Sequence, residues 1–190
     1  TGPGSSPHTY QLLLNKALKV KIQPVFGYNG TASIVLGMDR GEIDGIVISW
    51  FSLAIQKADD LKNKNVIPLV QFGDARVKDP LSGLPPAADD LFKDATEEDR
   101  QLLALAQRPF TWSRAFVAPP GMDAKVLATI RAAFMQTTAD PDFLADAKQL
   151  KFDVDAVSGE RIQEAITDYM RTPRPIVDRL TELVEADTPR

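Results

Sequence analysis

The residues best placed to do chemistry open the chain, as Thr1-Gly2-Pro3-Gly4-Ser5-Ser6-Pro7-His8. Gly2 and Gly4 allow the backbone to approach a ligand closely, while Ser5 and Ser6 offer hydroxyls and a helix cap. Proline suits the first helical position, so a helix is expected to begin near His8. Its amide N–H groups and positive dipole end favour a carboxylate or phosphate. A capped helix start without a ligand is the simpler alternative.

Two further turns carry residues that could contact a small molecule. One is Gly27-Tyr28-Asn29-Gly30, and the other is Ser49-Trp50-Phe51-Ser52. If both follow strands of one parallel sheet, they lie at the same sheet edge as the first turn, where ligands bind. Tyr28, Ser49 and Trp50 are therefore candidate ligand-binding residues. Packing roles for the two aromatic rings are the alternative.

Catalytic and metal chemistry has little support in the residue types. The chain has no Cys and one His, which removes thiolate nucleophiles, disulfides and His-pair metal sites. A hydrolase using Ser5 or Ser6 with His8 would need a nucleophile–base hydrogen bond that such close neighbours do not obviously make. The carboxylates Asp39, Glu42 and Asp44 cluster around a helix end, but general acid–base work needs two that face each other in a cleft, and Asp39 and Glu42 are more simply solvated turn residues. We therefore expect no enzymatic activity, metal or cofactor.

The composition excludes several classes of partner. The chain has 190 residues, 44% of them hydrophobic, and a formal net charge of −4. Nucleic acids and anionic lipid surfaces require clusters of Lys and Arg, so neither is expected as a partner. The longest apolar runs are far shorter than the ~20 residues that span a bilayer.

Hydrophobic spacing predicts alternating helices and strands in the first half of the chain. Helices are expected from about residue 8 to 18, after Thr31 and from residue 50 to 58, with strands at 20–26, 43–49 and 66–72. This alternation is typical of a parallel α/β sheet. Residues 73–95 read as an irregular connection. The remainder is mainly helical, with caps predicted at Thr96, Asp140 and Ser158 and short strands at 116–118 and 152–156.

Seven short motifs in order resemble the Bug family, the solute receptors of tripartite tricarboxylate transporters. They are Gly2-x-Gly4-Ser5-x-x-His8, Gly27-Tyr28-x-Gly30, Arg40-Gly41-Glu42-Ile43-Asp44-Gly45, Val70-Gln71-Phe72-Gly73, Ala118-Pro119-Pro120-Gly121, Arg131-Ala132-Ala133-Phe134 and Asp140-Pro141-x-Phe143-Leu144. Together they cover nearly the whole chain. Trp50 departs from the smaller or polar residues expected at its turn, and this hints at a bulkier ligand.

The resemblance implies a type II periplasmic binding fold. Residues 1–105 would form the parallel-sheet second lobe, and residues 106–190 the helical return into a first lobe. The family grips a ligand carboxylate with two loops, one of which maps onto Gly2 to Ser6. The implied function is capture of a small di- or tricarboxylate or aromatic acid outside the cytoplasm, for delivery to membrane transporter subunits without catalysis.

The family's N-terminal third has no counterpart in this chain. We expect a native protein about 100–140 residues longer, with a secretory signal and a periplasmic location. If this chain exists alone, helices without a sheet to cover are expected to pack on another copy. The effector-sensing domain of a transcription regulator, which uses a similar two-lobe fold, is the alternative function.

Overall fold

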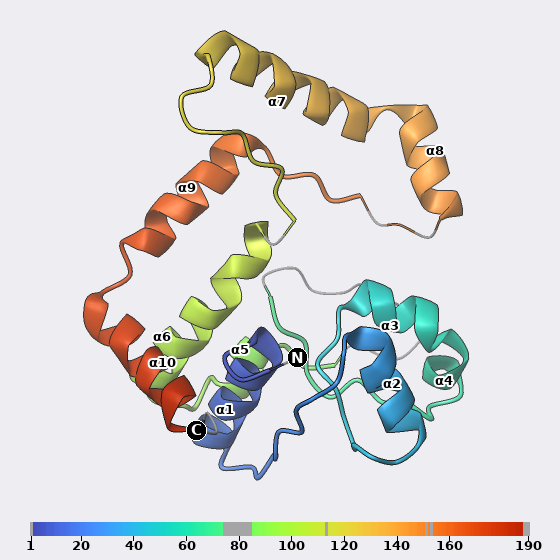
Figure 1. The fold of residues 1–190 in the computed structure, drawn as a ribbon, viewed down its shortest axis with the longest axis vertical. Helices are drawn as coiled ribbons and strands as arrows, with labels where there is room; N and C mark the ends of the chain where they lie inside the picture. The colour runs from blue at the N-terminus through green and yellow to red at the C-terminus, as the bar shows by residue number, and fades with distance from the viewer. Residues whose placement is uncertain (1, 74–84, 113, 151, 153, 188–190) are drawn as a thin grey trace. The chain divides into compact units, whose positions relative to one another are not determined.

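The computed structural model describes residues 2–73, 85–112, 114–150, 152 and 154–187, and these contain eleven helical segments (Figure 1). They belong to two compact units. The first consists of Thr1–Phe110 with Thr172–Arg190, and the second of Thr111–Arg171. The last helix of the chain packs back on the first unit.

Three helices and one helical turn build the core of the first unit. The helices are α1 (Ser6–Leu18), α6 (Glu97–Gln107) and α10 (Arg174–Ala186), and the turn is α5 (Ala88–Leu91). The fully packed side chains at their centre are Tyr10, Leu13, Leu14, Ala88, Phe92, Leu102 and Leu103. Ile176, Leu180 and Leu183 of α10 pack against this cluster from one side.

The apolar stripe predicted for the first helix is the face that α1 buries. Tyr10 stacks on Phe72 with ring centroids 4.1 Å apart, and its hydroxyl donates to the carbonyl of Ala106 at 3.1 Å. Burial raises the pKa of the Tyr10 phenol. The helix ends at Leu18, and Lys19, with a φ of 54°, turns the chain out of the helix. The predicted helix over residues 8–18 is thus confirmed.

An ion-pair network joins the three core helices at their polar edge. Lys16 of α1 pairs with Asp99 and, at 3.0 Å, with Glu98, both on α6, and Arg179 of α10 lies 3.4 Å from Glu98. Thr96 caps α6, as predicted, by accepting the Asp99 N–H at 3.1 Å. The network therefore links three segments far apart in the sequence.

The remaining helices of the first unit are short. They are α2 (Thr31–Asp39), α3 (Trp50–Gln56) and α4 (Ala58–Lys62). Lys57, between α3 and α4, is almost completely buried and pairs with Asp39 of α2 and with Asp60 of α4. These ion pairs hold the three helices together.

The predicted parallel α/β sheet is wrong. In the described residues, the only β pairing is an isolated parallel bridge between Gln71 and Ala87. Residues 20–26, 43–49 and 116–118 form neither a helix nor a strand. Many of their apolar side chains are exposed, including Val20, Ile22, Val25, Val47, Phe116 and Val117. A type II periplasmic binding fold needs that sheet, so the fold is corrected to a helical one.

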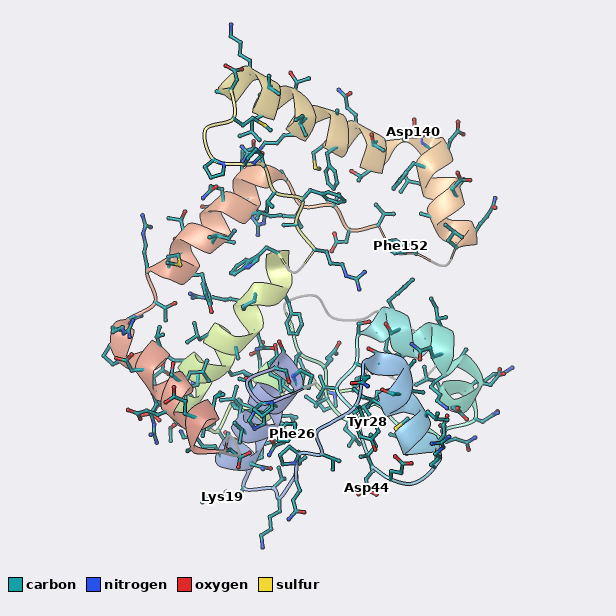
Figure 2. The ribbon with its side chains drawn as sticks, viewed as in Figure 1. Lys19, Phe26, Tyr28, Asp44, Asp140 and Phe152 are labelled. Carbon is teal, nitrogen blue, oxygen red and sulfur yellow. The ribbon has the colours of Figure 1, made fainter. Side chains whose placement is uncertain are left out.

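The side-chain amide of Asn15 makes the backbone hydrogen bonds that a neighbouring strand would otherwise make to Ile22, within residues 20–26. Asn15 of α1 accepts the Ile22 N–H and donates to the Ile22 carbonyl, both at 2.8 Å, and Gln11 donates to the same carbonyl. This satisfies the backbone of Ile22 without a neighbouring strand. The segment 19–29 then carries Phe26 alongside α1 and Tyr28 alongside α2 (Figure 2).

The connection predicted over residues 73–95 is only partly irregular. Its Pro80 and Gly83 lie outside the described residues. Residues 88–91 instead form α5, and Ala87, Ala88 and Phe92 are among the most buried side chains. Because the segment is rich in proline, its sequence predicted an irregular connection and not this short core helix.

The second unit contains α7 (Ala124–Ala139), α8 (Pro141–Gln149) and α9 (Gly159–Met170), preceded by the 3-10 turn Arg108–Trp112. The predicted caps are confirmed. Asp140 accepts the N–H groups of Asp142 and Phe143, and Ser158 accepts that of Arg161. Arg131 of α7 bonds to Glu160 of α9 at 2.9 Å.

Candidate functional site

The amino-terminal turn leads into α1 through a tight backbone arrangement. The Ser5 N–H donates to the Gly2 carbonyl at 3.2 Å, and Gly4 has a φ of 76°, which glycine adopts without strain. Gly4 is exposed, yet a Cβ there would lie 3.9 Å from Val184 of α10. Thr1, the first residue of the motif, lies outside the described residues.

His8 is the most constrained polar residue of this turn. Its side chain is 1% exposed, its Nδ1 accepts the Gly4 N–H at 3.0 Å, and its Nε2 lies 3.0 Å from Oδ2 of Asp187. Phe26 meets the imidazole edge-on, with ring centroids 5.2 Å apart. Because Nδ1 accepts a hydrogen bond, the geometry assigns the proton to Nε2, which donates to Asp187.

The hydrogen bonds of His8 also bear on the hydrolase alternative. A general base must accept the proton of the nucleophile through a free ring nitrogen. Here one nitrogen receives a backbone N–H and the other faces a carboxylate. His8 therefore positions the Gly4 backbone, and this arrangement leaves it no nitrogen for Ser5 or Ser6.

The two serines keep their hydrogen-bonding capacity. Ser5 stands at the N-cap position, but its side chain makes no capping bond, and its Oγ is buried without a partner. Ser6 is exposed. Amides of the first helical turn have no partner within a helix, and Pro7 has no N–H, so the donors of this turn are the amides of Ser6 and His8. Together with the hydroxyls, these groups suit an anion.

Tyr28 has a packing role at α2. Its hydroxyl donates to Oε2 of Glu42 at 2.9 Å, and this bond raises the pKa of the Tyr28 phenol. The ring lies directly over Gly37, where an added Cβ would be 2.7 Å from the Tyr28 hydroxyl oxygen. The glycine provides the space that the ring occupies.

Ser49 and Trp50 form the start of α3. The Ser49 Oγ accepts the Ser52 N–H at 3.2 Å and donates to the Ser52 hydroxyl at 2.8 Å. Trp50 is the first residue of the helix and is half-buried. In the described part of the chain no sheet edge gathers the three turns: Tyr28 bonds to Glu42 and Ser49 to Ser52, while the Ser5 hydroxyl has no partner.

The acidic residues near α2 have structural partners. Asp39 pairs with Lys57, and Glu42 accepts the Tyr28 hydroxyl and lies 3.8 Å from Arg40. Among the described residues, no group of three His, Asp or Glu side chains is arranged to hold a metal ion. No described helix is long and apolar enough to cross a membrane.

Sequence reasoning missed Asp187. It lies directly after α10, 179 positions from the histidine that it contacts. Its only local signal is an acidic residue near a helix end, which is common on any protein surface. Asp187 reaches His8 of the amino-terminal turn because α10 packs against α1.

Comparisons with protein-family models, with curated proteins and with solved structures find no match for this chain. The family resemblance of the seven motifs therefore stays a prediction.

Proposed function

We propose that the amino-terminal turn of α1 binds the carboxylate of a small organic acid, and that the chain serves as a solute receptor. One observation carries the proposal: the Ser5 hydroxyl is buried without a partner at a helix start that it does not cap. An anion at the amides of Ser6 and His8 would use the charge of the helix end. The exposed Ser6 side chain is directly available to it.

The motif resemblance supports the physiological side of the proposal. It favours capture of a di- or tricarboxylate or an aromatic acid outside the cytoplasm, and transfer to subunits of a tripartite tricarboxylate-type transporter. No catalytic step belongs to it, because His8 has neither ring nitrogen free to act as a base for Ser5 or Ser6. The chemistry is reversible binding.

The test measures thermal unfolding with succinate, citrate and benzoate, each against its uncharged amide. An acid at ~100 times its dissociation constant adds about 2.7 kcal/mol to stability, which raises the Tm by several degrees. The acids should act and the amides should not. If no acid shifts the Tm, or if the amides act equally, carboxylate binding is excluded.

A matched pair of variants locates the site. Ser158 resembles Ser5 as a helix N-cap, but its hydroxyl accepts the Arg161 N–H. Ser158→Ala should cost about 1 kcal/mol of stability and leave acid binding unchanged. Ser5→Ala with Ser6→Ala should instead weaken acid binding at least tenfold, because one hydrogen bond to a charged group is worth about 1.5–3 kcal/mol. Unchanged affinity in this double variant would place the site elsewhere.

A further inference from the structure

The second unit leaves an apolar face of α7 open to solvent. Val126, Ile130 and Phe134 follow one another at intervals of four residues, so they lie along one side of the helix. They are 49%, 51% and 38% exposed. Ala133 and Thr137 lie within the same stripe, so no charged residue interrupts it. This set of five residues is called the α7 stripe below.

Neighbouring aromatic residues extend the α7 stripe on both sides. Phe116 is 89% exposed, and its ring centroid lies 5.6 Å from that of Phe134. On α8, Phe143 is 40% exposed. With Ala133, Gln136, Thr137 and Asp140, it lines an open pocket of about 310 Å³ at the junction of the two helices. A helical face of this kind is normally covered.

The area of this face matches one half of a protein interface. From their exposed fractions, Phe116, Val126, Ile130, Phe134 and Phe143 present roughly 550 Å² of apolar surface. Interfaces are about 60% apolar, so a face of this size with its polar rim amounts to roughly 900 Å². Two such faces give ~1,800 Å², within the range of about 1,200–2,000 Å² for stable complexes.

We propose that this face pairs with the same face of a second copy of the chain, α7 against α7. In an antiparallel pair about a two-fold axis near Ala133, Ile130 of each copy lies opposite Phe134 of the other, so the stripe is self-complementary. Ala133, with its small side chain, lets the two helices approach closely. Val126 of one copy then lies at the pocket beside Phe143 of the other. The inference is independent of ligand binding.

The first test is the mass of the 190-residue chain in solution, measured by light scattering after size-exclusion chromatography. A particle of twice the chain mass at micromolar concentration is expected. Ile130→Glu should weaken the dimer at least tenfold, because it places an unpaired charge at the centre of the contact. The control Ile67→Glu makes the same change at a residue 67% exposed in the first unit, and should leave the dimer unchanged.

Circular dichroism of Ile130→Glu checks that its helices remain. Because Ile130 is half exposed, we expect the helices to remain folded in this variant. A wild-type chain that is monomeric at 100 µM, or a dimer that Ile130→Glu leaves as tight as the wild type, would overturn the proposal.

The cysteine-free sequence allows a second, independent test. Ala133→Cys introduces a single thiol next to the proposed axis, where mild oxidation should join two chains through a disulfide. Ala128→Cys places the thiol on the opposite side of α7 and should remain a free thiol. Equal cross-linking of both variants, or of neither, would contradict an α7 pair and point to another cover for this face.

Discussion

His8 connects the two ends of the first unit: its Nε2 lies 3.0 Å from Oδ2 of Asp187, 179 positions later in the chain. The other ring nitrogen holds the Gly4 N–H. The imidazole thus fixes the amino-terminal turn on one side and the end of α10 on the other. The histidine near which the sequence predicts the start of the first helix is a buried structural link.

Replacing His8 should destabilise the protein. His8→Ala removes a buried ring and leaves the Gly4 N–H without its acceptor, so we expect a loss of about 1–3 kcal/mol in urea unfolding. Asp187→Asn should lower the stability less, because an amide oxygen can still accept the hydrogen bond from the Nε2–H of His8. If His8→Ala is as stable as the wild type, the link has no energetic role.

Imidazole ¹⁵N resonances check the same geometry directly, since the chain has a single histidine. The Nε2–H tautomer is expected at pH 8, where Gly4 donates to Nδ1. The Nδ1–H tautomer would contradict the hydrogen bonds described for this turn.

The ion pairs of Asp99 predict how stability depends on pH. Burial by itself would raise the pKa of this carboxyl, but hydrogen bonds from Lys16 and Thr96 outweigh burial and lower it. A carboxyl with a lowered pKa stabilises the fold above its unfolded pKa of about 3.9, and this contribution disappears as the pH falls further. The free energy of unfolding should therefore fall below about pH 4, and less steeply in Asp99→Asn.

The contribution of Lys16 to stability depends on pH in the opposite direction to that of Asp99. Burial tends to lower the pKa of its ammonium group, but the bonds to Asp99 and Glu98 raise it overall. Its contribution is present below the unfolded pKa of about 10.4 and is lost as the pH rises further, so Lys16→Gln should flatten the alkaline side. Asp178→Asn, at an exposed pair with Arg174, is the control. An identical acid profile in Asp99→Asn and in this control would refute the assignment.

Tyr28 and Gly37 should be energetically coupled. Gly37→Ala would place a methyl group 2.7 Å from the Tyr28 hydroxyl oxygen, so the ring must move and its bond to Glu42 is lost. We expect this single change to lower stability. In a Tyr28→Ala background the same change should raise it by about 0.5–1 kcal/mol, since alanine favours helices over glycine. Equal effects in both backgrounds, in a double-mutant cycle, would show that the ring does not occupy this space.

Sequence reasoning succeeded where the determining interactions are local. Thr96, Asp140 and Ser158 each cap the helix predicted to follow, because an N-cap acts on amides two or three residues away. The stripe that includes Tyr10 and Leu13 likewise predicts the buried face of α1. Among the site residues, the turn before α1 could be recognised from its glycines, serines and proline.

The amino-acid sequence by itself thus determined where α6, α8 and α9 start and which face α1 buries. Only the tertiary structure decided what becomes of the apolar segments between them. Residues 43–49 have the composition of a buried strand, but a strand needs neighbours from distant parts of the chain, and composition does not supply them. Ile22 is satisfied by Asn15 instead, and His8 meets Asp187 because α1 and α10 pack on the same core. The contact between His8 and Asp187 depends on long-range packing, which local sequence patterns do not encode.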